Sequence, residues 1–315
     1  MSKSTMSNGS STATQLADPT LTHRSTSSSI STSTSAATTQ PLPPAHVFQT
    51  SPSSSGLSLE ARHYKAHNDI PNTILSVSII STILGGILFT SFTLVGLSLS
   101  GCIKSGTNGA EWGTWARPQL GVYFGCMALF HLSEFWTTAG WNKDRLSVDA
   151  FLLNNGNGYI LAHVVGLVEY FAWSYFWPRE GSWWISSGWL YVVLPVLLAA
   201  QALRTLAMVH AASSFSHEVS RGAKADDHTL VTRGVYQFSR HPSYTGFFYW
   251  AVATQVLLGN VISVAGFVYV LAKFFEARII DEERHLVRFF GQDYVDFRNK
   301  VGTWLPAGLV AKAAR

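Results

Sequence analysis

The sequence predicts an all-α fold: a polytopic membrane helix bundle of about six transmembrane segments, with a C-terminal helical hairpin, a cytosolic loop and a C-terminal helix. Only 13% of the 315 residues are charged, about half the share that is usual in soluble domains. Hydrophobic residues make up 47% of the chain, and they recur in segments of about 20, the length that a helix needs to cross a bilayer. The mean hydropathy is only +0.17, because a polar N-terminal region is averaged with an apolar remainder.

Residues 1–65 are expected to form a disordered cytosolic tail. Of the first 60 residues, 28 are Ser or Thr, and large apolar side chains are scarce. Such a segment cannot bury enough apolar surface to offset the entropy that a chain loses on folding. Residues 66–211 are assigned to the first four transmembrane helices, and residues 212–315 to a separate C-terminal region.

Uncharged or nearly uncharged segments define the spans. The first lies between Asp69 and Lys104, which enclose 34 uncharged residues. The next three are expected at about Leu120 to Trp141, Tyr159 to Trp177 and Gly188 to Met208, with Trp and Tyr near their ends as in interfacial anchors. The apolar stretch from Tyr244 to Ala272 is too long for one span and slightly short for two, and Gly259-Asn260 lies at its middle. It therefore predicts a tight hairpin with two tilted or shallow legs.

The distribution of basic residues supports six segments. With a cytosolic N-terminus, only Lys104, Arg117 and Arg179 of the 22 Lys and Arg residues would face the lumen, as the positive-inside rule requires. The hairpin also brings residues 212–243 and 276–305 to the same cytosolic face. No run of five basic residues occurs, so the net charge of +4 is not taken as a sign of nucleic-acid binding.

Polar residues inside the predicted spans are the first candidates for function, because charges in hydrocarbon are costly. His131 and Glu134 share a face of the second span, and His163 and Glu169 lie on the third. They could form a proton relay or a substrate pocket, or they could fix helix packing by interhelical hydrogen bonds. Both interpretations stay open.

The loop from His217 to Tyr244 gathers His217, His228 and His241 before the hairpin. These histidines lack the HxxxH and HExxH spacings and have no thiolate partner, so a zinc site is only a minority alternative and no metal is expected. Pro242 is placed at a helix start, where free backbone amides could bind an anion or belong to an ordinary capped helix.

A third polar block follows the last apolar leg. Arg278 and Glu282 are four residues apart, hence on one helical face. They could form a surface ion pair of about 0.3–0.5 kcal/mol. Because they lie where the leg leaves the membrane, opposite the histidine loop, they could instead hold two oppositely charged ligands side by side.

The stretches HTLVTRGVYQFSRHPSYTGFFYW, QVLLGN and FFEARIIDEERHLVRFFGQDYVDFRNKVGTWLP resemble the isoprenylcysteine carboxyl methyltransferase family. The resemblance is specific over about residues 217–306 and weaker upstream. It implies an enzyme of the endoplasmic reticulum membrane with its active site facing the cytosol. Such an enzyme uses S-adenosylmethionine to methylate the C-terminal carboxylate of a prenylated cysteine in CaaX-processed proteins. The implied partners are these proteins and membrane lipids, without nucleic acid.

The resemblance also implies that residues 212–315 form the catalytic methyltransferase region, with a cytosolic cofactor-binding loop, and it implies roles for matching positions. Arg278 corresponds to a substrate-binding arginine. The cofactor-binding positions would be His228, Thr229, Leu230, Val231, Tyr236, His241, Pro242, Ser243, Tyr244 and Glu282. Near Ser220 and Arg221 the chain departs from the family pattern by an apparent one-residue insertion, so neither receives a cofactor contact.

The implied reaction needs no general base, because a carboxylate is already ionised near neutral pH. The expected mechanism is therefore positioning and desolvation, and no residue is named as catalytic. The alternatives are a phospholipid N-methyltransferase, a sterol reductase with a nicotinamide cofactor, and a transporter or channel.

Overall fold

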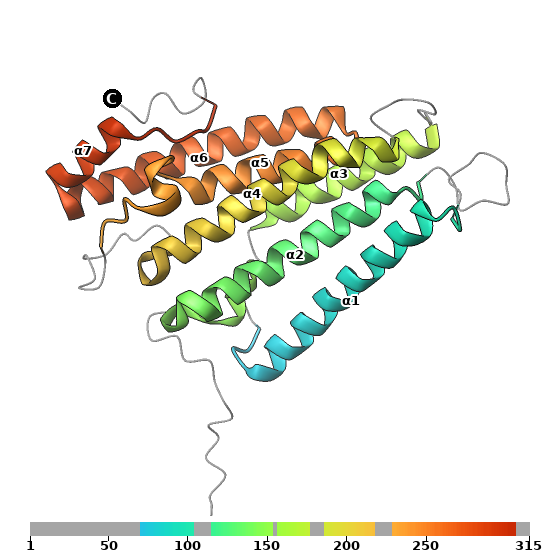
Figure 1. Cartoon of the computed structure of the whole chain (residues 1–315), viewed down its shortest axis with the longest axis horizontal. Coiled ribbons are helices and arrows are strands. Elements are labelled where there is room, and N and C mark those ends of the chain that lie inside the picture. Colours follow the sequence, from blue (N-terminus) through green and yellow to red (C-terminus); the bar gives the residue numbers. More distant parts are fainter. Residues whose placement is uncertain (1–69, 104–114, 154–155, 177–185, 218–228, 307–315) are drawn as a thin grey trace, which may run out of the picture. The chain divides into compact units, whose positions relative to one another are not determined.

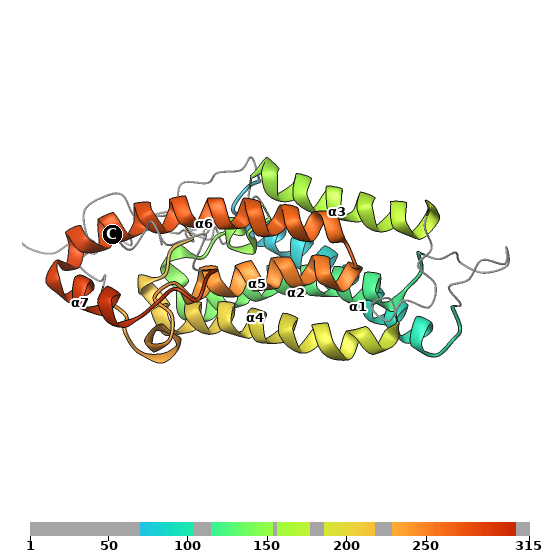
Figure 2. The same ribbon diagram turned by 90° about the horizontal axis from the view of Figure 1, so that it is seen from above.

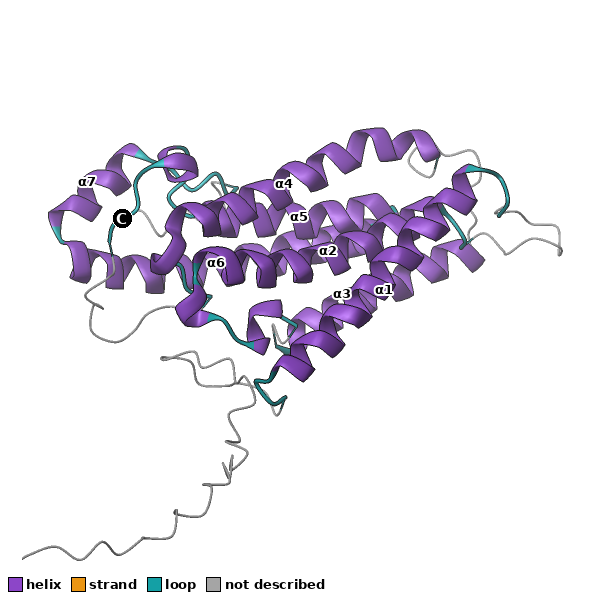
Figure 3. Cartoon of the chain, turned by 60° about the horizontal axis from the view of Figure 1, so that its bottom comes forward, coloured by secondary structure: helices purple, strands orange, loops and turns teal. Residues whose placement is uncertain are grey.

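The computed structural model describes residues 70–103, 115–153, 156–176, 186–217 and 229–306, and these residues form helices and connecting loops without a strand (Figure 3). This confirms the predicted all-α class. The predicted tail, residues 1–65, lies outside the described residues, as do Lys104, Arg179 and His228.

The helices follow the predicted segments closely. They are α1 (Ile74–Leu99), α2 (Pro118–Trp141), α3 (Asn157–Phe176), α4 (Leu190–Ala211), α5 (Pro242–Leu258), α6 (Val261–Phe290) and α7 (Gln292–Lys300). The hairpin between α5 and α6 turns at Gly259 and Asn260, as predicted. Because α6 continues well past Ala272, the block that contains Arg278 and Glu282 is an extension of the second hairpin leg.

Within the described residues, two helical segments are long and apolar enough to cross a membrane by length and composition. They are Ile74–Leu99 and Ser187–Ser214, the second of which contains α4. The remaining helices carry more polar residues or, like the 17-residue α5, fall short of the roughly 20 residues that one span needs. The count of six spans therefore stays a prediction.

The helices from α1 to α6 lie roughly side by side (Figure 1). Helix α1 packs on α2, α4 runs along α5, and α5 contacts both α2 and α6. Figure 2 shows α2 and α5 between α4 on one side and α3 and α6 on the other. The largest buried cluster of the described residues contains the stacked rings of Phe130 and Trp250, whose centroids lie 4.5 Å apart.

A close approach of two backbones places the start of α5 against α4. A Cβ atom on Gly246 would lie 2.7 Å from the backbone nitrogen of Arg204 and 2.8 Å from the carbonyl oxygen of Ala200. Small residues allow this approach between helices that pack without a large hydrophobic driving force. Arg204 is thereby brought beside the first turn of α5.

Glu169 of α3 caps the N-terminus of α6 at the hairpin turn. Its carboxylate accepts hydrogen bonds from the backbone nitrogens of Ile262 at 2.9 Å and Ser263 at 2.7 Å, and from the hydroxyl of Ser263 at 2.6 Å. The side chain of Asn260 donates to the carbonyl of Gly166 at 2.7 Å. These bonds favour the packing interpretation for Glu169.

The two histidines of the predicted second and third spans also bond to neighbouring elements. His131 Nδ1 donates to the carbonyl of Phe151 at 2.8 Å, so its Nε2 is left to accept from the hydroxyl of Tyr159 at 3.3 Å. His163 Nδ1 lies 2.9 Å from the hydroxyl of Tyr123. Both histidines therefore tie α2 to neighbouring parts of the bundle.

Candidate active site

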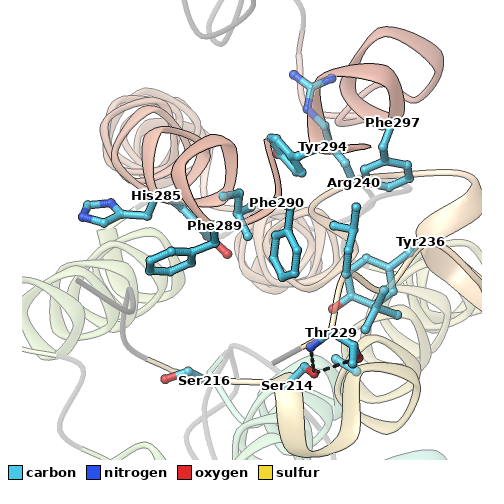
Figure 4. A pocket seen from close by; sticks show the side chains of 15 residues that line it. Ser214, Ser216, Thr229, Tyr236, Arg240, His285, Phe289, Phe290, Tyr294 and Phe297 are labelled. Atoms are coloured by element: carbon cyan, nitrogen blue, oxygen red, sulfur yellow. Dashed lines mark hydrogen bonds between the residues drawn. The ribbon is translucent and has the colours of Figure 1, made fainter. Parts of the chain in front are cut away.

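A pocket lies between the end of α4, the segment that begins at residue 229, and the C-terminal part of α6 with α7 (Figure 4). Predicted cofactor residues from two distant parts of the sequence line it together: Thr229, Leu230, Val231, Tyr236 and Glu282. Helix α6 brings Glu282 to the pocket because it projects beyond the hairpin partner α5.

The pocket walls differ in chemistry. Phe289, Phe290 and Tyr294 form an aromatic wall from α6 and α7 (Figure 4). Across from it, Ser214 accepts a hydrogen bond from the backbone nitrogen of Thr229 at 3.4 Å. One aromatic wall, one carboxylate and a few hydroxyl groups suit a ligand with a flat ring system and polar substituents.

Tyr244 connects the two residues of the α6 block. Its hydroxyl donates to Glu282 Oε2 at 2.5 Å and accepts from Arg278 Nε at 2.9 Å. The Arg278 guanidinium carbon lies 5.5 Å from the centre of the Tyr244 ring, and Arg278 also donates to the carbonyl of His217. Arg278 and Glu282 are therefore joined through a phenol. Among the described contacts they form no direct surface ion pair.

None of the predicted cofactor residues from His241 to Tyr244 is among those that line the pocket; they lie next to the lining residue Glu282, to which Tyr244 is hydrogen-bonded. Pro242 occupies the first turn of α5, as predicted. The buried ring of His241 stacks on Tyr244 with centroids 5.5 Å apart. His241 Nε2 lies 3.1 Å from Glu283 Oε1, and Arg240 Nε donates to the same oxygen at 2.6 Å. These contacts fix the α5 start against α6.

The carboxylate of Glu283 is held in its charged form. Its burial by itself raises the pKa, but the hydrogen bonds and charges of His241 and Arg240 outweigh burial and hold the pKa of Glu283 below its usual value. A negative charge is thus maintained beside the pocket-lining Glu282. Glu283 is bonded to Arg240 and His241, whereas Glu282 lines the pocket and is bonded to Tyr244.

Arg204 is a charged residue of the site region that the sequence analysis did not single out. Its guanidinium forms a bidentate ion pair with Glu134, at 2.8 Å and 2.9 Å, and donates to the hydroxyl of Ser243 at 2.6 Å. The Arg204 and Glu134 side chains are 7% and 1% exposed. The pair joins α2, α4 and the start of α5, so Glu134 has a specific partner. A lone arginine within a predicted span was the signal that could have revealed it.

His210, also not singled out, docks the pocket segment on α4. Its Nδ1 accepts a hydrogen bond from the backbone nitrogen of Val235 at 3.2 Å. Gly234 has a φ of +64°, and a Cβ there would lie 2.5 Å from His210 Nδ1. The neighbouring Tyr236 donates its hydroxyl to the carbonyl of Ala207 at 3.3 Å. His210 and Gly234 therefore set the position of one pocket wall.

A helical bundle with two candidate membrane spans, and with a pocket and an arginine beside it at one end, is the arrangement expected of an integral membrane enzyme. Residues 192–288 match the model of the isoprenylcysteine carboxyl methyltransferase family. A solved structure of the eukaryotic intramembrane Ras methyltransferase ICMT superposes with a TM-score of 0.57 and 39% identity, covering 60% of this chain and 66% of that chain.

Two fungal relatives are closely similar in sequence. The protein-S-isoprenylcysteine O-methyltransferase of Schizosaccharomyces pombe is 41% identical over 233 residues, which cover 70% of this chain and 98% of the relative. That of Saccharomyces cerevisiae is 44% identical over 192 residues, 60% of this chain and 80% of the relative. The chain belongs to the isoprenylcysteine carboxyl methyltransferase family.

Proposed function

We propose that this protein transfers a methyl group from S-adenosylmethionine to the C-terminal α-carboxylate of S-isoprenylcysteine in prenylated, CaaX-processed proteins. The observation that carries the proposal is the chain of contacts from Arg278 through Tyr244 to Glu282, with Glu282 in the wall of the pocket. This chain puts a cationic group for the acceptor next to an anionic group for the donor.

The pocket is proposed to hold S-adenosylmethionine. The aromatic wall of Phe289 and Phe290 suits the adenine ring, and Glu282 is suited to accept hydrogen bonds from the ribose or the amino group. Thr229, Leu230 and Val231 would close the opposite side, together with Tyr236. His241, Pro242, Ser243 and Tyr244 would act by holding this wall in place, and His228 is carried over from the family pattern.

Arg278 is proposed to bind the acceptor carboxylate by charge-assisted hydrogen bonds. An α-carboxyl group has a pKa of roughly 3.5, so it is ionised at neutral pH and can attack directly. An oxygen–methyl bond forms while the bond from the methyl carbon to the sulfonium breaks, and the leaving sulfur becomes a neutral thioether. The negative charge of the carboxylate and the positive charge of the sulfonium are both lost in this step. The protein therefore accelerates it by aligning the two groups and excluding water.

The proposed location is the endoplasmic reticulum membrane, with the pocket on the cytosolic side. The donor is water-soluble and reaches the site from the cytosol, whereas the prenyl chain of the acceptor lies in the bilayer. Residues 212–315, which follow α4, would then form the catalytic region, because both ligands meet only at the membrane interface.

The decisive experiment is methyl transfer by the full chain in membranes. Labelled S-adenosylmethionine is offered with N-acetyl-S-farnesylcysteine, and phosphatidylethanolamine serves as the comparison acceptor. We expect a labelled methyl ester of the farnesylcysteine and no labelled lipid. Label in the lipid amine alone would reject the proposal in favour of a phospholipid N-methyltransferase.

Replacing His210 by alanine is expected to raise the KM for S-adenosylmethionine about fivefold, the effect of losing one hydrogen bond of about 1 kcal/mol. The reason is that the backbone nitrogen of Val235 loses its hydrogen-bond acceptor, so the pocket-lining residues on either side of it, Val231 and Tyr236, are held less firmly against α4. Donor titrations of methyl transfer measure it. His210→Asn should restore the KM, because its oxygen can occupy the place of Nδ1, whereas His210→Gln should not. Equal effects of Ala and Asn would contradict this role.

A further inference from the structure

Three exposed aromatic residues that do not line the pocket, Phe238, Tyr249 and Trp304, form a patch near it. The side chains of Phe238 and Trp304 are 61% and 58% exposed, and their ring centroids lie 6.3 Å apart. The hydroxyl of Tyr249 donates to the carbonyl of Trp304 at 3.0 Å. Large aromatic rings gathered on a surface lose much favourable burial, so such a patch indicates a partner.

The backbone of Trp304 is in an unusual conformation. Its φ is +56°, in the left-handed region where an L side chain is strained and glycine is favoured. The next residue, Leu305, is buried against Phe248 and Ile279. The backbone conformation at Trp304 thus allows the Leu305 side chain to be buried while the Trp304 ring stays exposed. Strain kept at an exposed bulky residue points to a role for that residue.

The segment that carries Trp304, residues 301–305, is hydrogen-bonded to the residues just before α5. The backbone nitrogen of Arg240 donates to the carbonyl of Gly302 at 2.9 Å, and the hydroxyl of Ser239 donates to the carbonyl of Thr303 at 2.9 Å. Phe238 precedes these two anchoring residues directly. Phe238 is therefore two residues from the pocket residue Tyr236 along the chain, and the segment that carries Trp304 is hydrogen-bonded to the residues that follow Phe238.

The two segments that carry the patch expose only basic charged side chains, while Arg240 between them is paired with Glu283 of α6. Residues 229–249 and 297–306 contain Arg233, Arg240, Arg298 and Lys300 but neither Asp nor Glu, and Arg233 and Lys300 are exposed. The adjoining hairpin leg α6 exposes apolar residues such as Val270 and Phe274. Exposed aromatic rings on segments whose exposed charges are basic match the interface of a bilayer with anionic headgroups.

We propose that the patch of Phe238, Tyr249 and Trp304 inserts into the cytosolic interface of the membrane and sets the depth of the adjacent pocket. The partner is the lipid surface, in preference to a second copy of the chain or a soluble protein. This inference deepens the proposed function and rests on it for the side of the membrane. Contact with lipid can be tested without any methyl transfer, so the two proposals can fail separately.

The test uses the full chain with Cys102→Ala and Cys126→Ala, so that an environment-sensitive fluorophore can be attached to a single cysteine. Trp304→Cys carries the label in the patch, and Asn299→Cys, exposed on α7, carries it in the control. Both proteins are reconstituted in phosphatidylcholine–phosphatidylserine vesicles that contain lipids with a nitroxide near the headgroup. We expect about fivefold stronger quenching at position 304 than at position 299, since collisional quenching requires contact with the lipid. Equal quenching at both positions overturns the proposal, whether water, a protein or a second copy covers the patch.

A second variant separates the ring from its backbone. Trp304→Gly removes the ring and suits the left-handed φ, so the folded chain should be at least as resistant to thermal unfolding as the parent. The KM for a vesicle-bound prenylcysteine acceptor should rise about fivefold, as for the loss of one partly buried aromatic ring, while the KM in detergent micelles stays unchanged. Trp304→Phe should restore it. An unchanged KM in vesicles, in a variant that transfers methyl groups normally, overturns the proposal.

Discussion

Replacing Arg204 by alanine is expected to lower the free energy of unfolding by about 3–5 kcal/mol, because Glu134 is left as an uncompensated buried charge. The Glu134 side chain is 1% exposed and has its bidentate partner in Arg204. The loss of the bond to Ser243 would also loosen the start of α5, and methyl transfer should fall with it. Thermal unfolding of the full chain in lipid nanodiscs measures the effect.

The control for this prediction removes both charges. The double variant Arg204→Met and Glu134→Leu should recover most of the lost stability, because apolar groups of similar volume often replace a buried ion pair at little cost. If the single and double variants unfold at the same temperature, the stability resides in packing around these side chains, and the ion-pair explanation is wrong.

Arg278→Ala is expected to lower kcat/KM for the prenylcysteine acceptor about 10- to 100-fold, as for the loss of charge-assisted hydrogen bonds of about 1.5–3 kcal/mol. Binding of S-adenosylmethionine should change little. Glu282→Ala should do the reverse, because Glu282 lines the pocket whereas Arg278 stands beside it. Separate titrations of donor and acceptor, with donor binding measured by calorimetry, distinguish the two patterns.

Arg288 supplies the matched control for these variants, since it is exposed on the same helix α6. Arg288→Ala should leave both titrations within about twofold of the parent, as is usual for exposed charges. Parent-like kinetics of both Arg278→Ala and Glu282→Ala would reduce the two residues to surface polar groups without a role in binding. Tyr244→Phe should affect both ligands, because the phenol joins both side chains.

The helices could be predicted because their signals are local. The span before α2 has no charge between Asp69 and Lys104, and the hairpin turn falls at Gly259 and Asn260, where the breaker residues stand. The length of α6 was less evident, since its polar C-terminal part has no apolar stretch to mark it. That extension carries Glu282 to the pocket.

The pocket could be predicted in part. Thr229, Leu230, Val231 and Tyr236 meet Glu282 there, as the family pattern implied. The same pattern does not show that Glu283 of α6 is bonded to Arg240 and lies 3.1 Å from His241 Nε2. Those contacts depend on how α5 and α6 are rotated against one another, which a linear pattern does not specify.

The sequence by itself determined the helical class, the turn of the hairpin and the family, since each depends on residue types at short spacing along one segment. Only the tertiary structure decided the partners of the polar groups. Arg204 meets Glu134 and His210 meets Val235 because the helices pack at particular rotations and depths. A buried polar group must find its partner in whichever segment packing brings within hydrogen-bonding distance, and that segment is distant in sequence.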